Sequence, residues 1–117
     1  MSIPYVRGSL KNIDTDGDGI ADCLQFKLLN SLGTGSVYVS DLRILVDGKD
    51  YTKDTTFKIG DKAPRPATNL GYVYSNYGDE ILVEVKHKGE IKSGKHRIEI
   101  SIQSDMGSYT ISFEDTV

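Results

Sequence analysis

Apolar residues alternate with polar residues in several short segments, and this period of two constrains the fold more than any other feature of the sequence. In the clearest segment, Leu24, Phe26 and Leu28 share one side and the residues between them share the other. Residues 81–85, 98–102 and 109–113 repeat this pattern. Apolar residues do not recur at spacings of three and four over a helical length. The pattern therefore predicts an all-β protein.

The number and spacing of these segments predict their arrangement. Seven to nine short strands, with turn residues at intervals of roughly 8–12 residues, are typical of an antiparallel sandwich. A chain of 117 residues has the size of one domain. We therefore expect a single β-sandwich domain over residues 1–117, with the two-sheet architecture of immunoglobulin and fibronectin domains.

Two local features define the start of the chain. Residues 1–7 are expected to form a lead-in or an edge segment. Residues 10–13 and 21–29 are expected to form a hairpin whose long connection is rich in aspartate and glycine.

The segment VYVSDLRILV, residues 37–46, changes its apolar phase in the middle. Its first apolar residues have odd numbers and its later ones have even numbers, which a regular strand does not allow. We therefore expect a bulge or break near Ser40 and Asp41. Asp47 and Gly48 then form a typical hairpin turn.

Composition argues against several classes of function. The net charge is −3, with 14 basic and 17 acidic residues, so nothing favours binding to the nucleic-acid backbone. The sequence contains neither a membrane-length apolar run nor an apolar signal region in MSIPYVRGSL. Cys23 is the only cysteine, which fits a reducing compartment, and no activating neighbour is evident for it. We expect a cytoplasmic protein that binds neither nucleic acid nor membrane.

The acidic loop IDTDGDGIADC is a candidate calcium site. Calcium prefers several oxygen ligands around a tight turn, and alternate aspartates with a glycine at the bend provide them. On the twelve-residue calcium-loop pattern, Gly19 takes the turn, but Gln25 stands where the last glutamate belongs. The alternative is a solvated turn, because turns use the same residues. The expected ligands are Asp14, Asp16, Asp18, the Ile20 carbonyl and Asp22.

The two histidines allow two interpretations. If residues 81–85 pair with 98–102, the apolar residues match in register and His87 lies opposite His96. No third ligand for zinc is evident there, so a polar end to the core is the favoured interpretation. Alternatively, residues 89–95 cross between the two sheets and the histidines never meet.

A group of tyrosines is a candidate partner interface. Tyr72, Tyr74 and Tyr77 follow Arg65, and tyrosine and arginine are enriched at interface hot spots. The alternative is burial of Tyr72 and Tyr74 on one strand face. No serine, cysteine or threonine nucleophile with a base and no phosphate-binding glycine loop is evident, so no catalytic residue is assigned.

The succession of segments resembles a known family. LKN, LQFKL, SDLRILVDGKDY, FKIGDK and EILVEVKHKGEIKSGKHRIEISIQ follow one another as in the small β subunits of bacterial C-glycoside deglycosidases. Residues 10–13, 25–28, 46–48 and 89–96 stand at the places of that family's short motifs. The resemblance covers about nine tenths of the chain, and the acidic loop replaces a shorter turn.

The resemblance implies an accessory subunit that is not catalytic on its own. It would form a hetero-oligomer with a larger TIM-barrel α subunit, which carries a divalent metal (Mn²⁺) and the catalytic base. Such a lyase cleaves the carbon–carbon bond between a 3-oxo sugar and an aglycone, for example in flavonoid C-glycoside metabolism. A second hypothesis is a calcium-stabilised binding or adhesion module from a larger secreted protein, which the acidic loop favours.

Overall fold

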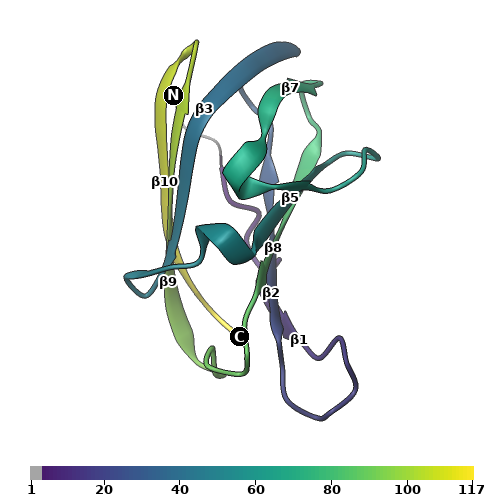
Figure 1. The fold of residues 1–117 in the computed structure, drawn as a ribbon, viewed down its shortest axis with the longest axis vertical. Coiled ribbons are helices and arrows are strands. Elements are labelled where there is room, and N and C mark those ends of the chain that lie inside the picture. Colours follow the sequence, from purple (N-terminus) through teal and green to yellow (C-terminus); the bar gives the residue numbers. More distant parts are fainter. Residues whose placement is uncertain (1–3) are drawn as a thin grey trace.

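The computed structural model describes residues 4–117 and contains ten β-strands in two antiparallel sheets (Figure 1). The prediction of an all-β sandwich is confirmed. No helix in the described part of the chain is long and apolar enough to cross a bilayer. The strands are β1 (Lys11–Ile13), β2 (Cys23–Leu29), β3 (Gly35–Val46), β4 (Lys49–Asp50), β5 (Thr55–Ile59), β6 (Arg65–Pro66), β7 (Gly71–Ser75), β8 (Glu80–Lys86), β9 (Lys95–Ser104) and β10 (Gly107–Thr116), with 3₁₀ turns η1 (Thr52–Asp54) and η2 (Ala67–Asn69).

The strands divide between the sheets in a way that the sequence did not predict. One sheet has the order β1-β2-β8-β5-β6, and the other has the order β10-β9-β3-β4 with β7 also paired to β3. The pairing proposed between residues 81–85 and 98–102 is wrong, because β8 pairs with β2 and β5 whereas β9 pairs with β3 and β10. The alternative is correct, since residues 87–94 cross from one sheet to the other.

The core lies between the sheets and follows the predicted alternation. Leu24, Phe26 and Leu28 of β2 are at most 1% exposed. Val83 and Val85 of β8 pack in the same core as Ile98 and Ile100 of β9. The other core side chains are Leu10, Leu42, Ile44, Val46, Tyr51, Phe57, Ala67, Leu70, Ile91 and Ile111.

An aromatic cluster closes the core beside the amino-terminal segment. The Tyr5 ring stacks on Phe113 with ring centroids 3.8 Å apart, and Phe26 meets Phe113 edge-on at 5.2 Å. Tyr5 also forms an isolated bridge with Leu28 at the edge of β2. The expectation of an edge segment is therefore correct for this residue, while residues 1–3 lie outside the described part of the chain.

Three local predictions are confirmed. β1 and β2 form the expected hairpin, with Ile13 opposite Cys23. The register of β3 against β9 shifts between Val39 and Asp41, at the expected bulge. Asp47 and Gly48 connect β3 to β4 with φ of 52° and 84°. Positive φ at both central positions defines a type I′ hairpin turn.

Candidate functional site

The acidic loop between β1 and β2 gathers three of the predicted ligands. Carboxylate oxygens of Asp14, Asp16 and Asp18 lie within 4.8 Å of one another, and all three side chains are exposed. The Asp14 carboxylate accepts hydrogen bonds from the backbone N–H groups of Gly17 and Gly19, at 2.8 and 2.7 Å. Both glycines have positive φ, which lets the backbone turn its N–H groups toward the carboxylate.

The crowding of these carboxylates changes their proton affinity. The hydrogen bond with Asp14 raises the pKa of Asp16 to about 6. The backbone hydrogen bond from Gly19 lowers the pKa of Asp14. Such a group of oxygens can attract a hard cation, which would relieve the repulsion between them.

Asp22 lies outside the group whose oxygens are within 4.8 Å of one another, although it is close enough to Asp14 and Asp16 for them to affect its pKa. The Asp22 carboxylate accepts hydrogen bonds from the backbone N–H and the hydroxyl of Thr15, and the backbone bond lowers its pKa. The Ile20 side chain lies against Gly89, where an added Cβ would be 2.8 Å from its Cγ2. The structure thus brings the carboxylates of Asp14, Asp16 and Asp18 together, and the calcium site stays a prediction.

The tyrosines form an exposed surface on the outer side of the second sheet and in the turn that follows β7. We call Tyr38, Tyr72, Tyr74 and Tyr77 the tyrosine surface. Tyr72 is 71% exposed and Tyr74 is 46% exposed, so the alternative of their burial on one strand face is wrong. Tyr38 of β3 lies directly opposite Tyr72 of β7, and their ring centroids are 4.9 Å apart. Tyr38 was not predicted as part of this surface, although its alternation with Val37 and Val39 places it on the outer face.

Arg65 of β6 and Lys62 of the turn before it hold the edge of β7. Arg65 donates to the carbonyls of Leu70 and Tyr72, at 3.1 and 2.6 Å. Lys62 donates to the Tyr74 carbonyl and lies 4.7 Å from the centre of the Tyr74 ring. Edge strands expose unpaired backbone groups that other chains can pair with, and charged side chains protect them. Arg65 therefore has a structural role here, and its predicted partner contact stays a prediction.

The two histidines lie at opposite ends of the crossover, and their surroundings shift their pKa values in opposite directions. The Nδ1 of His87 accepts hydrogen bonds from the backbone N–H groups of Gly89 and Ile91, at 3.1 and 3.4 Å. Its Nε2 lies 2.9 Å from the Asn12 Oδ1. The Asn12 amide nitrogen donates to the Ile91 carbonyl, so its oxygen faces the histidine and the ring is a neutral Nε2–H tautomer. Burial lowers the pKa of His87.

His96 instead lies between two acceptors. Its Nδ1 is 2.5 Å from the Asp47 carboxylate and its Nε2 is 2.5 Å from the Lys92 carbonyl. Burial lowers the pKa of His96, but the Asp47 carboxylate and the Lys92 carbonyl outweigh burial and raise it. The His96 ring ties the β3–β4 turn to the crossover, which favours the interpretation of polar groups at the end of the core.

Cys23 has no reactive setting. Its side chain is 1% exposed, and its thiol lies 3.7 Å from a Glu84 carboxylate oxygen. Burial, together with the negative charge of Glu84, raises the pKa of the thiol to about 11. A thiol that stays protonated at neutral pH is a poor nucleophile.

These features define a two-sheet β-sandwich domain with an exposed aromatic surface. The family model described as "C-glycoside deglycosidase beta subunit" matches residues 4–109. The chain belongs to this family, as the resemblance indicated. A β subunit implies a partner subunit in a hetero-oligomer.

Two further comparisons add little to this assignment. The search of curated proteins gave no match. Among solved structures, the chain is similar to a family 123 glycoside hydrolase from Clostridium perfringens, studied for glycolipid glycan hydrolysis, with 18% identity and a TM-score of 0.41. The match covers 84% of this chain and 21% of that hydrolase chain, so the present chain spans about a fifth of its length.

Proposed function

We propose that this chain is the non-catalytic subunit of a C-glycoside deglycosidase, a carbon–carbon lyase acting on 3-oxo-C-glycosides. It docks on a larger TIM-barrel subunit that carries a divalent metal (Mn²⁺) and the catalytic base. The family membership is the observation that carries the proposal, and it favours this function over a secreted binding module.

The chemistry of the reaction supports this division of roles. The oxidised C3 of the sugar acidifies the neighbouring C–H group, so proton abstraction and elimination release the aglycone. That step needs a base and a Lewis acid. In the described residues, His87 is occupied by three hydrogen bonds and Cys23 is buried and protonated. Neither is suited to the role of the base.

The tyrosine surface is the docking face that we propose for the larger subunit. Tyrosine supplies a large contact area with few rotatable bonds, and buried tyrosines are frequent hot spots at interfaces. Tyr38 and Tyr72 already hold each other in an edge-to-face pair, so little side-chain entropy is lost when a partner covers them.

A substitution pair tests the docking face. Tyr72→Lys should weaken binding of the larger subunit by at least about 30-fold, the size of a 2 kcal/mol hot spot. Thr110→Lys introduces the same charge at an exposed position of β10, on the same sheet but away from the tyrosines, and should bind as the unmodified chain does. Biolayer interferometry measures the affinity of each variant for the larger subunit. Equal binding by both variants would remove the tyrosine surface from the interface.

A further inference from the structure

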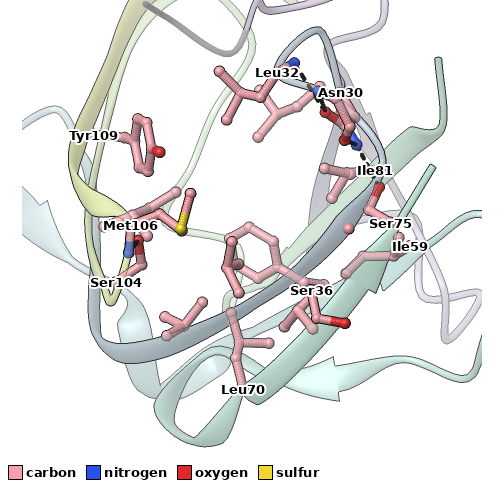
Figure 2. A pocket seen from close by; sticks show the side chains of 18 of the residues that line it. Asn30, Leu32, Ser36, Ile59, Leu70, Ser75, Ile81, Ser104, Met106 and Tyr109 are labelled. Atoms are coloured by element: carbon pink, nitrogen blue, oxygen red, sulfur yellow. Dashed lines mark hydrogen bonds between the residues drawn. The ribbon is translucent and has the colours of Figure 1, made fainter. Parts of the chain in front are cut away.

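An open cavity of about 400 Å³ lies between the two sheets (Figure 2). It is lined by the start of β3, by β7 and by the β9–β10 hairpin, which lie at the end of the sandwich away from the acidic loop (Figure 1). Its floor consists of the buried side chains Leu28 and Phe57 of the first sheet and Leu42 of the second. Protein interiors are close-packed and contain few voids larger than a water molecule. A hollow of this size that reaches the core is a departure from ordinary packing.

The walls of the cavity are mostly apolar. Within residues 4–117, no Asp, Glu, Lys, Arg or His lines it, although 26% of the whole chain is charged. The Asn30 amide at the rim is engaged within the protein, because it donates to Ser75 and Gly33 and accepts from the backbone N–H of Leu32. Asn30 therefore shapes the rim and is not available to an ion or a polar ligand.

The mouth of the cavity carries two adaptable groups from the β9–β10 hairpin. Met106 is 68% exposed at the tip of the hairpin, and its unbranched thioether can adjust to different shapes. The Tyr109 ring also borders the opening (Figure 2). Its hydroxyl makes no hydrogen bond within the described part of the chain, so it can bond one polar atom of an occupant.

We propose that this cavity binds a neutral, mostly apolar small molecule that carries one hydroxyl or carbonyl group near Tyr109. Small-molecule sites typically have volumes of about 300–1,000 Å³, apolar walls and few polar groups. The depth of the cavity favours a small molecule as its occupant over the flat surface of a partner protein, because the floor of the cavity lies among the core residues of both sheets. The inference goes beyond the proposed function, since docking uses the outer face of β3 and β7 and the cavity uses the inner face.

A neutral fluorescent probe, N-phenyl-1-naphthylamine, tests the proposal on the full chain. We expect saturable binding with a rise in fluorescence. Val73→Phe and Ile81→Phe fill the cavity from opposite walls and should each weaken binding at least tenfold. Val117→Phe makes a comparable change at the other end of the sandwich and should alter binding less than twofold. Circular dichroism and thermal melting identify the variants that fold. One folded variant of the two that fill the cavity is enough for the test.

Three results would overturn the proposal. The first is no saturable binding by the unmodified chain. The second is equal loss in the filling variants and in Val117→Phe, which would indicate binding elsewhere. The third is displacement of the probe by an equimolar amount of the larger subunit, which would indicate that the subunit fills the cavity.

Discussion

Replacement of His96 by glutamine tests the electrostatics of the crossover. Both ring nitrogens face acceptors, Asp47 and the Lys92 carbonyl, so the folded state prefers the doubly protonated ring. The glutamine amide carries both of its N–H donors on one nitrogen, so it does not reproduce the donors on opposite sides of the ring, and it carries no charge. A hydrogen bond to a charged group contributes about 1.5–3 kcal/mol. Because half of the Asp47 side chain is exposed, we expect about 1 kcal/mol after solvent screening.

The sign of the pH dependence follows from the raised pKa of His96. In the unfolded chain, His96 loses its proton near pH 6.5, whereas in the folded chain it keeps the proton to higher pH. The stabilisation is therefore complete below about pH 6.5 and is lost as pH rises through the folded pKa. Comparison of the variant with the unmodified chain removes the effects of other groups near the ring, such as Asp115 opposite it on β10.

Thermal melting from pH 5.5 to pH 9 provides the measurement. At pH 6 the His96→Gln variant should melt about 4 °C lower, since 1 kcal/mol corresponds to roughly that shift in a domain of this size. The difference should shrink as pH rises. Asp47→Asn should lose a similar amount of stability at pH 6, because it removes the charge of the acceptor. Parallel melting profiles for the unmodified chain and the His96→Gln variant across the range would refute the reasoning.

Three further predictions concern the core, the hairpin turn and the acidic loop. Phe26→Ala should lower the free energy of unfolding by about 3–5 kcal/mol in urea titrations, because it leaves a cavity beside Tyr5 and Phe113; a loss under 1 kcal/mol would contradict this packing. Gly48→Ala should cost about 1 kcal/mol by the same measurement, because its φ of 84° disfavours a side chain, and an unchanged midpoint would count against the turn. If residues 14–22 bind calcium, chelator should lower the melting temperature; a melting temperature that chelator leaves unchanged removes the metal site.

The alternation of apolar and polar residues predicted the fold, because the position of each residue in a strand decides whether its side chain faces the core. Leu24, Phe26 and Leu28 needed only their period to be placed in the core, and the phase change at Ser40 was sufficient to locate the bulge. The same use of alternation led to the wrong prediction that β8 pairs with β9. Inward-facing side chains of the two strands meet across the core, and a matching apolar pattern does not distinguish strands that face each other from strands that lie side by side.

The candidate sites were less predictable because they depend on distances between elements. Asp14, Asp16 and Asp18 lie close together in the sequence, which was sufficient to predict their grouping. The hydrogen bond that Asp22 accepts from Thr15 could not be predicted from their spacing. Arg65 was predicted at a partner contact, but the sequence does not show that the edge of β7 lies within its reach. The cavity was not predicted at all, because alternation indicates which side chains point inward but not how far apart the sheets lie.

Reconstitution with the protein encoded by the adjacent open reading frame tests the central claim most directly. The two chains, co-expressed and separated by size-exclusion chromatography with light scattering, should elute as one hetero-oligomer. With Mn²⁺, that complex should release the aglycone from a 3-oxo-C-glycoside, and the present chain alone should release none. Turnover by the purified chain alone, or a monomer that ignores the larger protein, would contradict the account.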